Sequence, residues 1–262
     1  MGIVKAGIIQ FDVRPGQVEA NVAKASAGVR ELAHAGATLV LLPEMWSCGF
    51  DYDHMPDHAA KTPGVIETLG ELARTCGLFI GGSLPRLAEG SVQNTLFLMD
   101  PQGKIIADYA KIHLFSPGDE HHHFKAGDRP TVCDTALGRT GCLICYDLRF
   151  PELCRTLALD GAETILVSAQ WPLSRLNHWK TLLRARAIEN QVFILASNSC
   201  GADSRQDYAG HSMILTPWGD CLVCAGREEV SLTASLDLSQ VAKVRAAIPC
   251  FADRRPLVYT GR

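Results

Sequence analysis

The sequence has no long apolar run and no run of basic residues. A helix that spans a bilayer needs about 20 consecutive apolar residues, and no stretch of the 262 residues approaches that length. Lys and Arg total 25 against 28 Asp and Glu, which gives a formal net charge of -3. Because no basic segment could follow a phosphate backbone, nucleic acid is not an expected partner. Because no apolar run is long enough to span a bilayer, a membrane is not an expected partner either.

The opening residues also lack the marks of an export signal. The stretch MGIVKAGIIQ shows no succession of charged, apolar and cleavage regions. Ala6 stands where a myristoylation signal requires Ser or Thr. We therefore expect a cytoplasmic protein. In a reducing compartment its 10 cysteines should be thiols that serve as packing residues, metal ligands or catalysts, and not a disulfide framework.

Apolar material, in contrast, is abundant. Hydrophobic residues make up 47% of the sequence, which is enough for a sizeable core. No low-complexity linker rich in Pro, Gly or Ser divides the chain, so we expect residues 1–262 to form a single domain. The predicted elements repeat in order, which defines halves of about 4–110 and 130–240, followed by a tail of about 245–262.

Each half reads as strand, helix, strand, helix, strand and hairpin. Glycine closes the apolar stripes of the predicted helices, as at Gly77 and Gly161. The hairpins are expected to turn at residues 100–103 and 216–219, which both contain Pro and Gly. The polar, His-rich segment 116–128 lies between the halves and is predicted to be a functional loop.

The distribution of apolar residues predicts how these elements pack. The helices are apolar on one stripe only, whereas strands such as TLVLLP and TILVSA are apolar on both faces. Stacking two sheets on each other with the helices outside buries all of these faces. The sequence therefore predicts an α/β fold, a four-layer α-β-β-α sandwich of two stacked mixed sheets with helices outside.

Three polar residues stand at the carboxyl ends of apolar strands: Glu44, Lys111 and Cys145. Sites in sheets of this kind assemble at that edge. Together, a carboxylate, an ammonium and a thiol could attack an amide carbon, because the carboxylate takes the thiol proton and the ammonium stabilises the charged intermediate. A sharp turn from strand to helix at Cys145 would also aim the backbone N–H of Tyr146 at the oxyanion.

Three blocks of the sequence, LLPEMWSCGF, YAKIHLF and CYDLRFPEL, resemble the signature blocks of the nitrilase, or carbon-nitrogen hydrolase, superfamily. The segment HWKTLLRARAIENQ is similar to the helix that follows them in that family. The resemblance implies a stacked two-sheet fold in which Glu44 is the general base, Lys111 stabilises the intermediate and Cys145 forms a thioester. It also implies a homodimer or larger homo-oligomer, with no cofactor and no metal.

Finer features resemble the omega-amidase group of this superfamily. They lie in KIHLFSPGDEHHHFKAGD and SAQWPLSRLNHW, and they imply a substrate such as 2-oxoglutaramate. Glu120 matches a second glutamate of the family and is expected to hold Lys111 or to orient the substrate. Arg149 and the histidines, His122 among them, are candidates for binding a substrate carboxylate. Arg149 also fits a structural ion pair, and Trp171 is expected either to line the pocket or to pack in the core.

Other interpretations remain open at the level of sequence. An N-carbamoyl or other small-amide hydrolase of the same superfamily is one, and a thiol-based sensor or binding protein without catalysis is another. The spacings of Cys142 with Cys145 and of Cys221 with Cys224 suggest zinc or a redox pair. Residues three apart on a strand, however, point to opposite faces. The side chains of the run 121–123 are expected to diverge in the same way, which favours a polar loop at the rim over a metal site.

Overall fold

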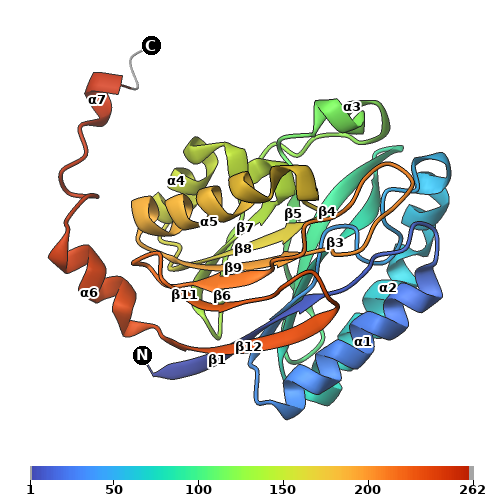
Figure 1. Ribbon diagram of the computed structural model, residues 1–262, viewed down its shortest axis with the longest axis horizontal. Coiled ribbons are helices and arrows are strands. Elements are labelled where there is room, and N and C mark those ends of the chain that lie inside the picture. The colour runs from blue at the N-terminus through green and yellow to red at the C-terminus, as the bar shows by residue number, and fades with distance from the viewer. Residues whose placement is uncertain (1, 260–262) are drawn as a thin grey trace.

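The computed structural model describes residues 2–259. Two mixed six-stranded sheets stack against each other, and helices cover their outer faces (Figure 1). This arrangement confirms the predicted α-β-β-α sandwich. Among residues 2–259, no helix is both long enough and apolar enough to cross a membrane.

The first sheet combines three parallel strands with an antiparallel pair. β1, β2 and β3 run parallel, and β4 and β5 continue as antiparallel neighbours. The other edge is formed by β12, from the far end of the chain, which pairs antiparallel with β1 along its whole length. Across the sheet the strands are β12 (Val230–Asp237), β1 (Ile3–Gln10), β2 (Leu39–Leu41), β3 (Phe79–Ala88), β4 (Ser91–Met99) and β5 (Ile105–Ala110).

The second sheet has the same plan. β7, β8 and β9 run parallel, β10 and β11 form the antiparallel hairpin, and β6 is an antiparallel edge beside β7. The hairpin turns where the sequence predicts, since the N–H of Gly219 donates to the carbonyl of Thr216 at 2.9 Å. Across the sheet the strands are β11 (Cys221–Cys224), β10 (Met213–Leu215), β9 (Phe193–Asn198), β8 (Thr164–Ala169), β7 (Gly138–Ile144) and β6 (Val132–Thr135).

Amphipathic helices bury one stripe each against the sheets. α1 and α2 cover the first sheet, and α4 and α5 cover the second (Figure 1). α2 ends at Cys76, where Gly77 adopts the left-handed φ of 67° that glycine tolerates best. The helices that cover the sheets are α1 (Val18–His34), α2 (Met55–Cys76), α4 (Pro151–Leu159) and α5 (Leu176–Asn190). The other α-helices are α3 (Glu120–His123), α6 (Ser239–Ala247) and α7 (Pro256–Tyr259), and the 3-10 helices are η1 (Tyr52–His54), η2 (Ser116–Gly118), η3 (Cys145–Arg149) and η4 (Leu173–Arg175).

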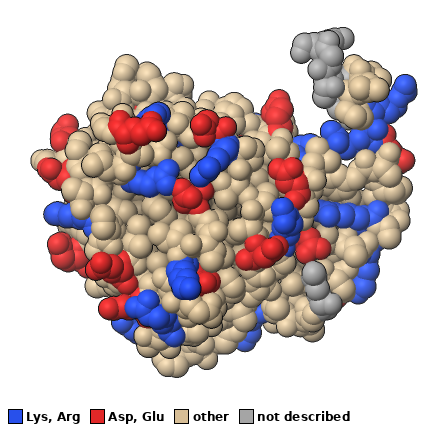
Figure 2. Space-filling view, turned by 180° about the vertical axis from the view of Figure 1, so that it is seen from behind, with Lys and Arg blue, Asp and Glu red and all other residues tan. Residues whose placement is uncertain are grey.

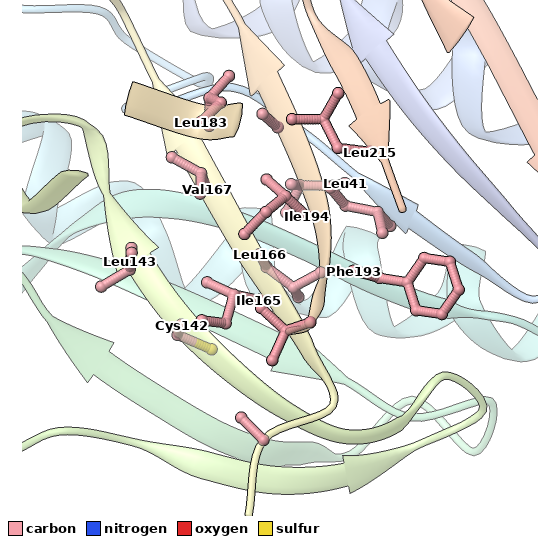
Figure 3. Packing of buried hydrophobic residues seen from close by; sticks show 14 of the residues in the cluster. Leu41, Cys142, Leu143, Ile165, Leu166, Val167, Leu183, Phe193, Ile194 and Leu215 are labelled. Atoms are coloured by element: carbon pink, nitrogen blue, oxygen red, sulfur yellow. The ribbon is translucent and has the colours of Figure 1, made fainter. Parts of the chain in front are cut away.

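Alternation along β2 divides the apolar core into two layers. Leu39 and Leu41 face the second sheet, where they join a cluster that includes Leu166 and Ile194. Val40 points the other way, into the cluster beneath α1 and α2. Figure 3 shows Leu41 beside the side chains of β8 and β9. Strands that are apolar on both faces therefore serve two cores, as the sequence predicts.

The surface carries charges of both signs, and the C-terminal segment leaves the body of the protein. Acidic and basic side chains are interspersed over the face seen in Figure 2. Beyond β12 the chain continues through α6, which buries Val241 and Val244, to α7, which stands away from the two sheets (Figure 1).

Candidate active site

The carboxyl ends of strands from both sheets open into one pocket of about 240 Å³. Glu44 follows β2, Cys145 follows β7 and Gln170 follows β8, and all three side chains line this pocket. Lys111 follows β5 and lies buried behind Glu44. The three residues predicted from strand ends therefore converge at one place.

A buried lysine joins two glutamates at the inner end of the pocket. Lys111 Nζ donates to Glu44 Oε1 at 2.7 Å and to Glu120 Oε1 at 2.8 Å. The side chains of Lys111, Glu44 and Glu120 are only 0%, 1% and 4% exposed. Two carboxyl groups thus share one ammonium, in a place that water hardly reaches.

Further donors hold both carboxylates in position. Asn94 Nδ2 donates to Glu44 Oε1 at 2.8 Å, and the backbone N–H of Gln170 donates to Glu44 Oε2 at 3.0 Å. The backbone N–H of Phe115 donates to Glu120 Oε2 at 3.0 Å. Because these donors come from both sheets and from the loop after β5, the network fixes the site across the two sheets.

The charges around Lys111 decide its protonation state. Burial alone would lower the pKa of its ammonium, but Glu120 and Glu44 outweigh burial and hold that pKa well above its usual range. Burial raises the pKa of Glu120, and Lys111 opposes that rise while Glu44 adds to it. Lys111 is therefore a permanent cation at physiological pH.

Cys145 is the first residue of η3, at the sharp turn where the chain leaves β7. Its φ of 44° is left-handed, which is a strained backbone conformation for a residue other than glycine. The half-buried residue presents its thiol to the pocket. Burial raises the pKa of the thiol well above its usual range, Glu44 adds to the rise, and Lys111 opposes it. The resting sulfur is therefore a neutral thiol.

Asp147, which the sequence analysis does not single out, anchors this turn. Its side chain is fully buried, and its Oδ2 accepts hydrogen bonds from the Tyr109 hydroxyl at 2.7 Å and from the backbone N–H of Ile144 at 3.0 Å. Its Oδ1 accepts from the backbone N–H of His113 at 3.0 Å and lies 2.8 Å from His113 Nδ1. The carboxylate therefore ties the turn at Cys145 to the segment that follows Lys111.

Arg149 and Trp171 stand together in the wall of the pocket. The Arg149 guanidinium lies 4.7 Å from the centre of the Trp171 ring, and both side chains line the pocket. Within residues 2–259 no carboxylate lies within ion-pair distance of Arg149, so the alternative of a structural ion pair is wrong. Trp171 is only 2% exposed and its Nε1 donates to the carbonyl of Arg175 at 2.9 Å, so it both packs in the core and lines the pocket.

The pocket wall also contains Tyr146 and two arginines that the sequence analysis passes over. Tyr146 packs edge-on against Phe115, with ring centres 5.0 Å apart. The Arg175 guanidinium lies 5.4 Å from the Phe115 ring centre, and Arg205 contacts Asp203 at 3.3 Å. No sequence motif distinguishes these arginines, because Arg175 ends the short 3-10 helix η4 and Arg205 lies in a loop, and neither segment has apolar periodicity.

The histidines of the loop after β5 do not line the pocket. His122 is exposed, and its ring lies 3.9 Å from that of His121, centre to centre. The expectation that neighbouring rings of this run diverge is therefore wrong for these two residues, because α3 brings them side by side. His123 alone turns away, and it stacks on Tyr52 with ring centres 4.1 Å apart.

One of the two cysteine pairs also departs from expectation. The register of β11 against β10 shifts by one residue, so that Cys224 lies opposite Met213 while Cys221 lies opposite Leu215. Met213 and Leu215 are two apart and share a face, so the bulge at Leu222 brings Cys221 and Cys224 onto one face as well. The prediction of opposite faces is therefore wrong for this pair.

Comparison with known proteins gives one family. Residues 5–246 match the family model of carbon-nitrogen hydrolases. A 2-oxoglutaramate amidase of Bacillus subtilis is 39% identical over 254 residues, which are 96% of this chain and 97% of that protein. An omega-amidase of Homo sapiens is 36% identical over 251 residues, 91% of each chain.

A solved structure shows the same fold. It is the amidase from Nesterenkonia sp. AN1, which is 26% identical, with a TM-score of 0.89 over 98% of this chain and 95% of that one. That structure is of a variant whose active-site cysteine carries the acetamide moiety of fluoroacetamide.

Proposed function

Because this chain belongs to the carbon-nitrogen hydrolase family and is a hydrolase of carbon–nitrogen bonds, we propose that it is an omega-amidase. It hydrolyses the side-chain amide of a 2-oxo dicarboxylic monoamide such as 2-oxoglutaramate, and releases ammonia and the free dicarboxylate. Two relatives with these activities in their names align with more than nine-tenths of the chain. Glu44, Lys111 and Cys145 at the pocket are the side chains to which we assign the reaction steps.

In the first half of the reaction Cys145 attacks the amide carbon. Glu44 takes the thiol proton as the sulfur–carbon bond forms, which is needed because the resting thiol is neutral. The Lys111 ammonium and the backbone N–H of Tyr146 stabilise the oxyanion. Glu44 then gives its proton to the leaving nitrogen, the carbon–nitrogen bond breaks, and ammonia departs from a thioester.

Water completes the cycle. Glu44 accepts a proton from a water molecule as that molecule attacks the thioester, and the proton returns to the sulfur as the acid product leaves. Glu120 keeps Lys111 in place throughout, through the 2.8 Å bond between their side chains. No step needs a cofactor or a metal.

One observation supports this proposal above the others: a single small pocket has Glu44, Lys111 and Cys145 at its inner end and arginine side chains in its wall. Arg149 and Arg175 both line the pocket, where they contact His178 and the rings of Trp171 and Phe115, and neither pairs with a carboxylate in the described part of the chain. A guanidinium binds a carboxylate through two parallel hydrogen bonds. The 2-oxo acid end of the substrate fits these arginines while its amide reaches Cys145.

Ammonia release from a panel of amides tests the choice of substrate. We expect kcat/KM for 2-oxoglutaramate to exceed that for succinamate, and both to exceed that for N-carbamoyl amino acids. Replacing Arg149 by Gln should lower kcat/KM for 2-oxoglutaramate by about tenfold to a hundredfold, the scale of a lost charged hydrogen bond. Butyramide, which has no carboxylate, serves as the control and should lose little. An equal loss on both substrates, or a preference for N-carbamoyl compounds, would contradict the proposal.

We also propose that the enzyme acts in the cytoplasm as a homodimer or larger oligomer. Its 10 cysteines are all free, as expected in a reducing compartment. Ile188 of α5 and Trp218 of the β10–β11 turn are each 50% exposed, Leu222 of β11 is 41% exposed, and Gly219 of the same turn packs against Ile188. Exposed apolar side chains of this kind are typical of a subunit contact. Sedimentation velocity gives the number of subunits.

A further inference from the structure

Three side chains that can bind a metal ion cluster at the rim of the pocket. The ligand atoms of Asp119, His121 and His122 all lie within 4.8 Å of one another. All three residues are exposed. In the described part of the chain, no hydrogen bond or ion pair occupies the Asp119 carboxylate or the ring nitrogens of these two histidines. Their donor atoms are therefore free.

The backbone explains why such close neighbours converge. Asp119 adopts a left-handed φ of 60° at the start of α3, and its carbonyl accepts the N–H of His122 at 3.0 Å. This turn places the carboxylate beside the two imidazoles, whose ring centres are 3.9 Å apart. His123 points elsewhere, against Tyr52. Three of the five side chains with ligand atoms in residues 119–123 are thus grouped, whereas Glu120 bonds Lys111 and His123 is set apart.

We propose that Asp119, His121 and His122 bind a divalent late transition-metal ion such as Zn²⁺. Two imidazoles and one carboxylate suit Zn²⁺, Ni²⁺ and Cu²⁺. Zinc–ligand distances of about 2.0–2.2 Å place the donors of a tetrahedral site about 3.4 Å apart. Exposed side chains can close the remaining gap by small rotations, and water completes the coordination.

Occupancy of this site acts on the loop that forms the pocket rim. Glu120, between the ligands, contacts Lys111, while Pro117 and Gly118 line the pocket. An ion that joins Asp119 to the two histidines therefore stiffens the segment that carries Glu120. The site is a separate property of the chain and does not depend on the proposed amidase activity.

Isothermal titration with ZnCl₂ tests the site directly. The protein is prepared without a histidine tag and with its exposed thiols removed, as Cys221→Ser, Cys224→Ser and Cys250→Ser, because thiolates also bind zinc. The parent should bind one equivalent of Zn²⁺ that is lost, or weakened about tenfold or more, in Asp119→Asn, His121→Ala and His122→Ala. Asn tolerates the left-handed backbone of position 119.

His123→Ala is the matched control, because it removes a neighbouring imidazole that lies outside the cluster. It should keep the bound equivalent. On addition of Zn²⁺, amide hydrogen exchange across residues 116–124 should slow in the parent and in His123→Ala. It should not change in the three variants that lack a ligand. Absence of binding in the parent, equal binding in all variants, or loss in His123→Ala would each overturn the proposal.

Discussion

At the scale of single residues, burial and neighbouring charges set the pKa values of the ionisable side chains in the pocket. Glu44, Lys111 and Glu120 are almost without solvent, and burial together with Glu44 raises the pKa of the neighbouring Cys145 thiol. A free thiolate is disfavoured there, so in the proposed mechanism the sulfur attacks only as its proton moves to Glu44. This separates the site from thiol enzymes that hold a resting ion pair.

Replacing Glu44 by Gln should remove the base and leave the fold intact. Gln keeps the shape of the side chain, and Lys111 retains Glu120 as its counter-ion. We expect kcat to fall by about 10²–10⁴-fold, the usual contribution of a general base. Glu89→Gln, which changes an exposed carboxylate paired with Lys125, is the matched control and should keep full activity. Loss of less than about tenfold in Glu44→Gln would show that another group takes the proton.

The raised pKa of the Cys145 thiol predicts a particular pH dependence of alkylation. When a thiol pKa lies above its ordinary range, the thiolate fraction near pH 7 is smaller than that of an exposed thiol, and it grows only as the pH rises toward the higher pKa. The rate of modification by iodoacetamide at Cys145, followed by peptide mass spectrometry, should therefore still increase between about pH 9 and 10. A rate that levels off near pH 7 would contradict this protonation state.

At this scale the sequence predicted which polar side chains meet in the pocket where their type suits the proposed chemistry. Glu44, Lys111 and Cys145 could be found because each is a polar residue at the end of an apolar strand within a recognisable block. Asn94 and Asp147 could not, because their importance lies in hydrogen bonds to distant segments that leave no local pattern.

At the scale of elements, the turn between β7 and η3 is the critical piece of the site. It forces Cys145 into a left-handed conformation, and the four hydrogen bonds to Asp147 hold it there. Strain at Cys145 is thus offset by a buried carboxylate two residues away.

Asp147→Asn should destabilise the protein, since an amide presents one acceptor oxygen and turns N–H donors toward backbone N–H groups. We expect the free energy of unfolding to fall by about 2–3 kcal/mol, measured by urea denaturation. Asp134→Asn, at an exposed position of β6, should change it by less than about 0.5 kcal/mol. Equal stability of the two variants would show that the hydrogen bonds to Asp147 are not needed to stabilise the turn at Cys145.

The boundaries of elements were predictable where local signals exist. Gly77 ends α2 and Gly219 completes the β10–β11 turn, as their positions in the sequence indicate. The bulge at Leu222 was not predictable, because an extra residue in one strand is defined only by its partner strand.

At the scale of the whole molecule, the contact between the two sheets creates the pocket. The Ser168 hydroxyl donates to the carbonyl of Leu42 at 2.8 Å, and that of Ser197 donates to the carbonyl of Ile9 at 2.6 Å, so polar bonds cross between the sheets. The stacking of apolar strands was predictable from their composition. The pairing of β12 with β1 was not, because partners so far apart in sequence share no local signal.

The core between the sheets should dominate stability. Leu166 is fully buried and meets Leu41 of the opposite sheet in the same cluster. Leu166→Ala should lower the free energy of unfolding by about 3–5 kcal/mol, from lost burial and the cavity that remains. Leu87→Ala, at a position 57% exposed, is the control and should have little effect. Similar losses in both variants would show that this interface is not the main core.

The most direct test of the whole proposal compares the protein with its Cys145→Ala variant in ammonia release from 2-oxoglutaramate, at matched circular dichroism and melting temperature. The Cys145 sulfur faces the pocket, lies beside the buried charged groups and is held by the strained turn, so the proposed mechanism depends on it. We expect turnover by the protein and a loss of more than about 10⁴-fold in the variant, as when another covalent nucleophile is removed. Retention of a substantial part of the activity by the alanine variant would contradict a mechanism through a thioester.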